Sequence, residues 1–299
     1  MSSKILVTGA TGALGRLVLK YLVHKNCTAV RAGVHRQERA EYVKMSGVQT
    51  VPLDFGDFAS IDRALEGIQT LFLLTPTVRE QVEFTRRMVD RCRLWGVERI
   101  VKLSIFGADS LPGTQITRWH NRSEAYIQDS GIPFTFVRPN AMMQNFVRQV
   151  QPAGSFLYFP LGQSRISFVD SRDVAAFCAE VISSSESQGP ILNLTGPSAL
   201  TMEEVAQAIT DVVGHHIGYI DTPEDTFAHF LESTGTQQWL ANALAELYSL
   251  WREGEFDVTV TSDFERMMGR KPFSFRKFCT DYAAIFRAII QQEHHTNMR

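Results

Sequence analysis

The chain has 299 residues, of which 44% are hydrophobic and 21% charged, and its formal net charge is −2. This composition is typical of a globular protein, and the length allows one large α/β unit with a smaller appended lobe. Because acidic and basic side chains nearly balance, neither a nucleic-acid partner nor an anionic membrane is indicated.

The cysteines are far apart and have no histidine partners at metal-ligand spacing; they are Cys27, Cys92, Cys178 and Cys279. This spacing argues against a zinc site and a disulfide framework, and it fits a reducing compartment. The apolar run at 5–10 is too short for a signal-peptide core, and no later run approaches ~18 apolar residues. We therefore expect a cytoplasmic protein without a metal site or a membrane partner.

The first two-thirds of the chain alternate short apolar runs with helical patterns. Strands are predicted at 4–8, 28–34, 49–53, 70–74, 99–103 and 134–138, and helices at 14–23, 38–45, 60–65, 78–94 and 117–130. Apolar strands that alternate with helices indicate a parallel sheet covered on both faces. Because such crossovers are right-handed, we expect an α/β fold with a doubly wound, Rossmann-type sheet.

The alternation breaks after Asn140. Residues 154–168 carry glycine, proline and aromatic residues and predict loop and short strand, followed by a helix at 170–183, a strand at 190–194 and a helix at 201–213. Thr201 with Glu204 three residues later predicts a capping box at the start of the last of these helices. The chain from 217 onward is expected to be mostly helical.

These patterns predict one domain in two parts. The sheet core is expected at about 1–153, with strand and helix returns at about 165–213. A smaller, mostly helical substrate lobe is expected at about 154–164 and 214–299, packed beside the edge where such sheets bind ligands.

The most informative segment, 7–16, joins the first predicted strand to the first predicted helix. Gly9 permits a tight turn, Gly12 lets backbone N–H groups approach a pyrophosphate, and Gly15 allows the helix to pack close to the strand. A diphosphate would then meet the free N–H groups and the positive dipole end of the helix. The alternative is a tight turn without a ligand. The segment predicts a dinucleotide site formed by Gly9, Thr11, Gly12, Ala13, Leu14 and Gly15.

The choice of dinucleotide is made after the second strand. His35 and Arg36 follow that strand, Arg39 lies one helical turn later, and no carboxylate precedes Glu38. An acidic residue here would hold a ribose 2′-hydroxyl, whereas arginine favours a 2′-phosphate, so NADP(H) is favoured over NAD(H). The alternative is that both arginines are solvated surface charges.

Two later strand ends add candidates for the same site. Asp54 and Phe55, after the third strand, can flank the adenine, and Thr75 and Pro76, after the fourth, lie where the ribose and nicotinamide would run. Both pairs are also compatible with ordinary strand-end turns.

The glycine turn, Ser104 after the fifth strand and the segments 131–140, 168–175 and 254–272 resemble the NmrA-like group of atypical short-chain dehydrogenases. The resemblance spans essentially the whole chain and implies a Rossmann core that prefers NADP(H). It also implies one of two roles: reduction of quinones, ketones, enones or imines, or dinucleotide sensing without turnover. The family's usual arginine after the second strand falls here on His35.

The resemblance also exposes a departure in the catalytic helix. Orthodox short-chain dehydrogenases carry a tyrosine, with a lysine four residues later, on the helix after strand five. When the helices are matched at Glu124, His120 stands at the lysine position and Ile116 at the tyrosine position. The usual Tyr-x-x-x-Lys is therefore absent from this helix.

The remaining candidates for chemistry lie near the carboxyl ends of the strands. His120 can donate a proton, because its ordinary pKa of ~6.5 is close to working pH, or it can bond the nicotinamide ribose; a structural histidine is the alternative. Ser104 can orient a substrate or cap its strand. Asn140 can contact cofactor or substrate, and Pro139 is expected beside the cofactor.

The favoured function is an NADPH-dependent reductase of a hydrophobic small molecule, because the C-terminal lobe is rich in aromatic residues. The open alternatives are an NADP(H)-sensing regulator and a non-redox isomerase or cyclase, since fold alone does not decide among them. A monomer or homodimer is expected. The pairs His215–His216 and His294–His295 are not interpreted as metal sites, because sequence neighbours on a helix point in different directions.

Overall fold

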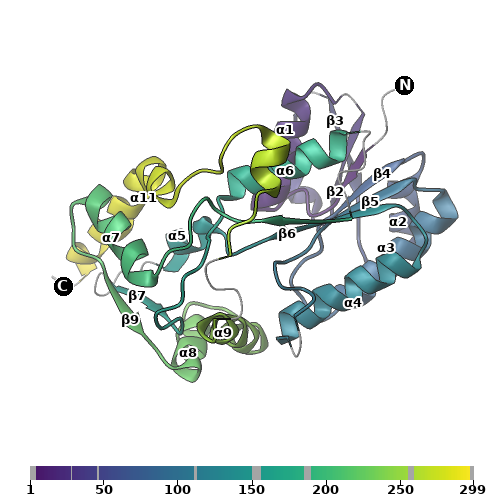
Figure 1. Ribbon diagram of the computed structural model, residues 1–299. Helices are drawn as coiled ribbons and strands as arrows, with labels where there is room; N and C mark the ends of the chain where they lie inside the picture. The colour runs from purple at the N-terminus through teal and green to yellow at the C-terminus, as the bar shows by residue number, and fades with distance from the viewer. Residues whose placement is uncertain are drawn as a thin grey trace. The chain divides into compact units, whose positions relative to one another are not determined.

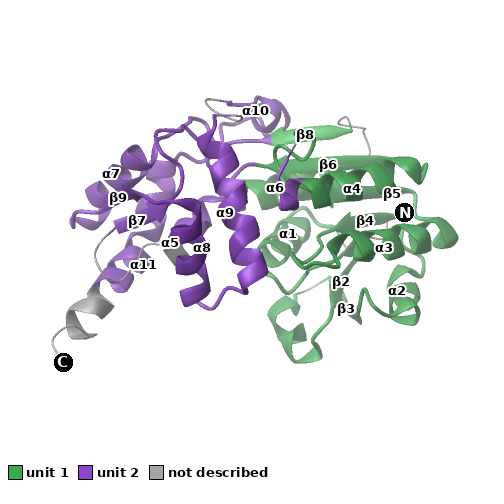
Figure 2. Ribbon diagram, turned by 90° about the horizontal axis from the view of Figure 1, so that it is seen from below, with its two compact units in different colours: residues 1–109, 118–139, 172–193 green, residues 110–117, 140–171, 194–299 purple. Residues whose placement is uncertain are grey.

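The computed structural model describes residues 5–27, 29–45, 47–110, 113–149, 156–184, 190–254 and 259–296. The chain divides into two compact units (Figure 2). Unit 1 comprises residues 1–109, 118–139 and 172–193, and unit 2 comprises residues 110–117, 140–171 and 194–299. Each unit is thus assembled from separate stretches of sequence.

Unit 1 is built on a twisted parallel sheet (Figure 1). In the described residues it has seven strands: β1 (Ile5–Val7), β2 (Val30–Val34), β3 (Val48–Pro52), β4 (Thr70–Leu73), β5 (Arg99–Leu103), β6 (Phe134–Pro139) and β8 (Ile191–Leu194). Their order is β3-β2-β1-β4-β5-β6-β8, so the direction of winding reverses between β1 and β4. The predicted doubly wound sheet is confirmed, and ligands of such sheets bind outside the carboxyl ends of the strands at that reversal.

Helices cover both faces of this sheet. On one face α2 (Phe58–Leu65), α3 (Gln81–Trp95) and α4 (Gln115–Asp129) pack their apolar sides into a core that includes Leu6 and Phe136. Because side chains alternate along a strand, the neighbours of Leu6 in β1 are buried against the other face. There α1 (Ala13–His24) and α6 (Ser171–Ser183) are linked by an ion pair at 2.6 Å between Lys25 and Glu180.

The helix expected at 38–45 is instead a 3₁₀ helix, η1 (Gln37–Val43). Val43 is the one side chain of η1 that is buried. The N-cap residue of η1, Arg36, makes no side-chain capping bond. Without an apolar face to bury, this segment gains little from α-helical packing, and short 3₁₀ turns are common as connectors.

Unit 2 contains a strand pair and a set of helices. Its parallel pair is β7 (Phe156–Phe159) with β9 (Gly218–Asp221). Its helical elements are η2 (Met143–Asn145), α5 (Phe146–Gln149), α7 (Met202–Val213), α8 (Glu224–Ser233), α9 (Gln238–Arg252), α10 (Asp263–Met268) and α11 (Phe275–Thr296). The strand β9 was not predicted, because its four residues are half-buried or exposed and its partner is about sixty positions away in sequence.

The capping box predicted for α7 is confirmed. The Thr201 hydroxyl oxygen accepts from the Glu204 backbone N–H at 3.2 Å, and the Glu204 carboxylate accepts from the Thr201 N–H at 3.0 Å. However, α7 belongs to unit 2 rather than to the sheet core expected at 165–213. It packs against α11 and β9, and Arg287 of α11 donates to the Val212 carbonyl.

Aromatic rings make much of the interior of unit 2. Phe159 contacts Phe146, with ring centroids 5.6 Å apart, and Phe227 at 5.4 Å, and Tyr248 packs edge-on against Trp251. These rings therefore serve packing within unit 2.

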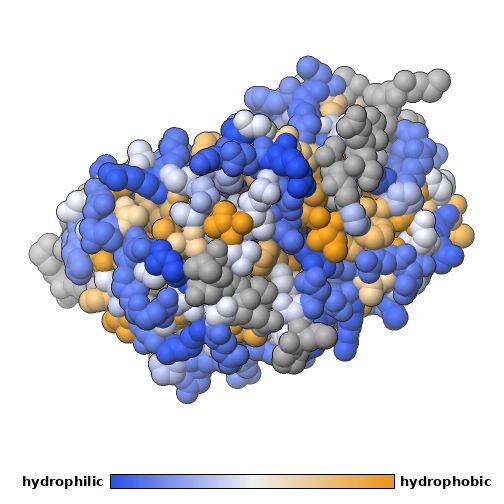
Figure 3. Space-filling model, viewed as in Figure 1, coloured by the Kyte–Doolittle hydropathy of each residue, from blue (hydrophilic) through white to orange (hydrophobic). Residues whose placement is uncertain are grey.

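On the surface, apolar residues form separate patches among hydrophilic ones (Figure 3). Among the helices that the structure describes, none has the length and apolar character needed to cross a bilayer.

Candidate functional site

The glycine turn between β1 and α1 has a backbone that admits only glycine at two positions. Gly9 has φ +59°, and a Cβ there would lie 2.8 Å from the Leu74 side chain. A Cβ at Gly15 would lie 2.2 Å from the Gly9 carbonyl oxygen, so α1 could not approach β1 as closely as it does. The turn is therefore fixed by close backbone approach.

The amino end of α1 is left open to a ligand. Gly12 is its N-cap, no side chain caps it, and the first turn contains no acidic residue. The first N–H groups of a helix lack partners within the helix and carry its positive dipole end, so this end suits a phosphate. Thr8 holds the turn against β4, because its hydroxyl oxygen accepts from the Leu74 N–H at 2.8 Å.

A cavity of about 670 Å³ opens at this turn, a size in the range of small-molecule sites. It lies at the carboxyl ends of β1, β2, β3 and β4, where the sheet reverses its winding. Its lining includes these predicted site residues: Gly9, Thr11, Gly12, Ala13, Leu14, His35, Arg36, Asp54, Phe55, Thr75 and Pro76. The structure therefore gathers at one place residues that sequence reasoning took from four separate segments.

Basic groups line one part of this cavity. His35, Arg36 and Arg39 all reach it, and all three are exposed. The His35 Nε2 lies 3.6 Å from the Asp54 carboxylate, a pair that is ionic only when the imidazole is protonated. The two guanidinium groups give this part of the cavity a positive charge suited to a phosphate monoester.

An aromatic wall stands beside Asp54. The rings of Phe55 and Phe84 stack with centroids 5.4 Å apart and an interplanar angle of 15°. Asp54 is held in a tight turn, since its carboxylate accepts from the Gly56 N–H at 2.7 Å. Sequence reasoning missed Phe84, which lies on α3 and reaches the cavity only through the fold.

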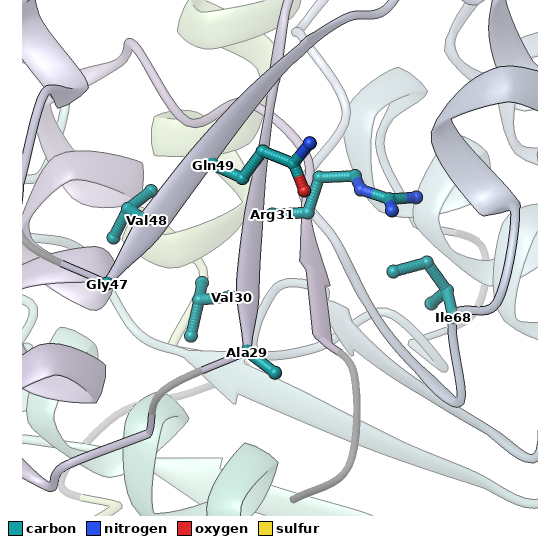
Figure 4. A pocket seen from close by; sticks show the side chains of 7 residues that line it. All are labelled: Ala29, Val30, Arg31, Gly47, Val48, Gln49 and Ile68. Atoms are coloured by element: carbon teal, nitrogen blue, oxygen red, sulfur yellow. The ribbon is translucent and has the colours of Figure 1, made fainter.

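A second cavity in unit 1, of about 410 Å³, lies at the amino ends of β2 and β3 (Figure 4). Its most polar side chain, Arg31, extends toward Ile68 and donates to the carbonyl oxygens of Ala64 and Glu66 at 2.8 and 2.9 Å. Because its guanidinium is committed to backbone carbonyls, and because ligands of parallel sheets bind at the opposite strand ends, this cavity is not the candidate site.

His120 and Ser104 lie close together at the carboxyl end of β5. This strand is the neighbour of β4 in the sheet, and the end of β4 lines the cavity. Ser104 follows β5, and its hydroxyl oxygen lies 3.3 Å from the His120 Nδ1 on α4. The Lys102 ammonium lies 3.5 Å from the same nitrogen and donates to the Leu103 carbonyl at 3.0 Å. Lys102 was not among the expected site residues, because the sequence around a lysine in a strand does not show which side chain it will contact.

Burial sets the charge of this trio. Burial, reinforced by the positive charges of Lys102 and Arg138, lowers the pKa of His120 well below its usual value, so the imidazole is neutral at pH 7. Burial also lowers the pKa of Lys102 to about 8, against the opposing effect of the Glu124 carboxylate. The hypothesis that an imidazolium at position 120 donates the proton is therefore disfavoured.

Behind the trio lies a buried ion pair. Arg138 of β6 donates to both Glu124 oxygens, at 3.0 and 2.5 Å, and both side chains are almost fully buried. The same guanidinium reaches the exposed Asp109 carboxylate at 2.9 Å. Burial alone would lower the pKa of Arg138, but these two carboxylates raise it. The pair holds α4 against β6 and so fixes where His120 stands.

The other predicted residues lie elsewhere. Gly15 is buried in the contact of α1 with the turn and does not line the cavity. Pro139 ends β6, where its carbonyl accepts from the Phe106 N–H at 3.0 Å. Asn140 belongs to unit 2 and is buried; its amide donates to the Ser167 hydroxyl at 3.0 Å and its carbonyl accepts from the Ala141 N–H at 2.8 Å. Both ends of the Asn140 side chain are thus engaged in local bonds.

Metal ligands do not converge in the described part of the chain, where no group of three or more His, Cys, Asp or Glu side chains is placed to hold an ion. The side chains of His294 and His295 lie outside the described residues, as do the strand and tail positions 28, 154, 155, 255 and 256 named in the sequence analysis.

The sequence matches the model of the NmrA-like family over residues 1–278. It is 30% identical to an NAD(P)H azoreductase of Xenophilus azovorans, over 95% of this chain and 99% of that enzyme. It is also 30% identical to quinone oxidoreductase 2 of Escherichia coli (strain K12), over 81% of this chain and 86% of that enzyme. A crystal structure of an NADPH-dependent quinone oxidoreductase of Escherichia coli with NADPH has a TM-score of 0.86 to this structure at 26% identity, covering 93% of this chain and 99% of that one.

Proposed function

Because the chain belongs to the NmrA-like family, we propose that it is an NADPH-dependent reductase of a hydrophobic small molecule such as a quinone, ketone, enone or imine. The observation that carries this proposal is the cavity at the carboxyl ends of β1–β4, with the uncapped amino end of α1 opening into it. The azoreductase and quinone reductase activities named for its relatives support a redox reaction on an unsaturated substrate.

The residues of the turn fit a dinucleotide diphosphate. Gly12 and the N–H groups of Ala13 and Leu14 stand where two phosphates would sit, and the closely packed Gly15 keeps the helix end near them. NADP(H) is preferred over NAD(H) in this proposal, because Arg36 and Arg39 offer two guanidinium groups for a 2′-phosphate. When bound, the nicotinamide supplies the hydride.

The protein's own residues then orient the reactants and manage a proton. Ser104 and the neutral imidazole of His120 are proposed to hydrogen-bond the ribose or the substrate. We propose that the reaction proceeds without the Tyr-x-x-x-Lys of orthodox relatives, since Ile116 and His120 stand at those positions of α4.

Binding and turnover test this proposal directly. Purified protein should bind NADPH at least tenfold more tightly than NADH in a calorimetric titration. It should also oxidise NADPH, measured as a fall in absorbance at 340 nm, when a quinone, enone or azo acceptor is present. Gly12→Val should abolish binding while leaving the circular dichroism spectrum unchanged, because the added side chain fills the phosphate position. Absence of affinity for either dinucleotide in the wild-type protein would refute the proposal.

A second candidate is an NADP(H) sensor, favoured because Ile116 and His120 stand at the tyrosine and lysine positions of the motif in α4. It would show unequal affinities for NADP⁺ and NADPH and no turnover with any acceptor. We further propose that the protein acts as a monomer or homodimer in a reducing cytoplasm, since Cys92, Cys178 and Cys279 are buried free thiols. Light scattering after size-exclusion chromatography measures the oligomeric state.

A further inference from the structure

Lys102 is a fully buried cation, and no carboxylate of the described residues lies in hydrogen-bond contact with it. Its ammonium donates to the Leu103 carbonyl and lies 3.5 Å from the His120 Nδ1. The buried Glu124 carboxylate, whose charge acts on Lys102, is already bound through both oxygens by Arg138. A buried charge without a paired counter-ion destabilises a fold, so ordinary packing does not account for a lysine at this position.

The contact of the Lys102 ammonium with His120 Nδ1 favours one tautomer of the ring. An ammonium group only donates, so Nδ1 must accept, and in a neutral imidazole the proton is then on Nε2. The Ser104 hydroxyl, 3.3 Å from Nδ1, could donate or accept and would not decide the tautomer alone. Although burial lowers its pKa, His120 is of intermediate exposure, so part of the residue faces solvent.

We propose that Lys102 is a positioning residue and the proton reservoir of the reductase. It supplies a proton to the reduced substrate through the neutral imidazole of His120. The proposal rests on the proposed function, because a reduction by hydride needs a proton for the anion that it produces. The same residues explain how a site without the usual tyrosine could supply that proton.

The relay conserves atoms and charge. As the reduced substrate anion takes the proton from Nε2, the electron pair of that N–H bond stays on the ring, and Nδ1 takes a proton from the Lys102 ammonium. The anion and the ammonium are both neutralised, and the imidazole remains neutral with its proton moved to Nδ1. The ring resets when Nδ1–H returns its proton to Nζ and Nε2 takes one from water.

The surrounding charges suit such a reservoir. Glu124 from α4 favours the charged ammonium. Arg138 from β6, itself paired with Glu124 and Asp109, helps to keep His120 neutral. Burial lowers the pKa of Lys102 to about 8, so the ammonium is charged at pH 7 yet acidic enough to give up its proton.

The first test needs no dinucleotide. In protein with ¹⁵N-labelled histidine, long-range proton–nitrogen spectra should show His120 as a neutral ring protonated on Nε2 at pH 6.5 to 7.5, its signal assigned by its loss in His120→Gln. A ring protonated on Nδ1, or a charged imidazolium at pH 6.5, would overturn the proposal. In Lys102→Met the Nδ1–H form should appear, because Ser104 can then accept from it.

The second test is the pH profile of turnover. Wild-type kcat should fall above about pH 8, as Lys102 loses its proton. Lys102→Met should lower kcat about 100-fold, change the Kd for NADPH less than threefold, and remove the alkaline limb. Ser104→Ala is the matched variant at the same nitrogen: it should keep both the Nε2–H tautomer and the alkaline limb.

These measurements separate the two proposals. If NADPH is turned over but Lys102→Met retains the wild-type limb, the relay is wrong and the reductase stands. If NADPH neither binds nor turns over, the proposed function and the relay that depends on it both fail. The tautomer of His120 measured in the free protein still tests the contact between Lys102 and Nδ1. Lys102→Gln repeats the comparison with a polar side chain, should Lys102→Met fail to fold.

Discussion

The cavity at the glycine turn and the charged cluster around His120 occupy neighbouring strand ends of unit 1, but different chemistry builds them. The turn is a continuous segment whose binding groups are backbone N–H groups placed by close approach of Gly15 to Gly9. The cluster draws side chains from β5, α4 and β6, held by the ion pair of Arg138 with Glu124.

The difference shows how each region fails. A backbone site depends on steric fit, so adding one carbon atom disrupts it even when no charge changes. A side-chain cluster depends on charge balance, so an isosteric neutral replacement disrupts it even when every atom still fits. Substitutions of these two kinds therefore test the comparison.

The largest effect is expected at the buried ion pair. Glu124→Gln keeps the shape of the side chain. Of the two carboxylates that the described residues bring to the buried Arg138 guanidinium, it leaves the exposed Asp109. Breaking a buried pair from one side costs about 3–5 kcal/mol of unfolding free energy, measured by urea denaturation. A matched control is Glu180→Gln, whose pair with Lys25 is about one-third exposed and should cost less than about 1 kcal/mol. Equal losses in the two variants would contradict the buried role.

The next effect is the dependence of stability on pH at Lys102. Its folded pKa of about 8 lies below the ordinary value of 10.5, so the unfolded chain binds more protons between these limits and stability rises with pH across them. The difference in pKa corresponds to about 3 kcal/mol of unfolding free energy. Wild-type protein should therefore gain unfolding free energy relative to Lys102→Met from pH 7.5 to 10. A flat difference would show that Lys102 is solvated.

Much of the fold was predictable because its signals are local. Apolar runs such as 99–103 and the helix ends marked by Gly96 and Gly131 identify strands and helices from nearby residues alone. The parallel order then follows from right-handed crossovers. The pair of β7 with β9 escaped prediction, because two short strands far apart in sequence gain their stability only from each other.

The site divides along the same line. The glycine turn and the strand-end residues His35, Asp54 and Thr75 were predicted, since strand ends of a parallel sheet meet at one edge. Lys102 and Phe84 were not, because each becomes a site residue only through partners that tertiary packing supplies. Asn140 was expected to contact ligand, but its amide is bonded to Ser167 and Ala141, a local arrangement that no sequence pattern announces.

A smaller effect is expected where sterics alone are changed. Gly15→Ala places a methyl group 2.2 Å from the Gly9 carbonyl oxygen, so α1 must shift away from the turn. We expect a loss of about 1–3 kcal/mol in unfolding free energy and at least a tenfold weaker NADPH affinity. Gly214→Ala is the control: its φ is +74° and no atom lies within 4 Å, so backbone strain should cost about 1 kcal/mol without touching affinity. An unchanged affinity in Gly15→Ala would break the link between packing and binding.

The smallest effect is expected at the exposed arginines of the cavity. Arg36→Ala and Arg39→Ala each remove one guanidinium that a 2′-phosphate would meet, while the helix end that holds the diphosphate is untouched. Each change should weaken NADPH binding about tenfold, equivalent to about 1.4 kcal/mol, and leave NADH binding within twofold in the same titration. High salt should reduce the difference, because charges at an exposed site are screened. Equal losses for NADPH and NADH would mean that these arginines contact the part that the two dinucleotides share, and the preference for NADP(H) would then have to come from His35.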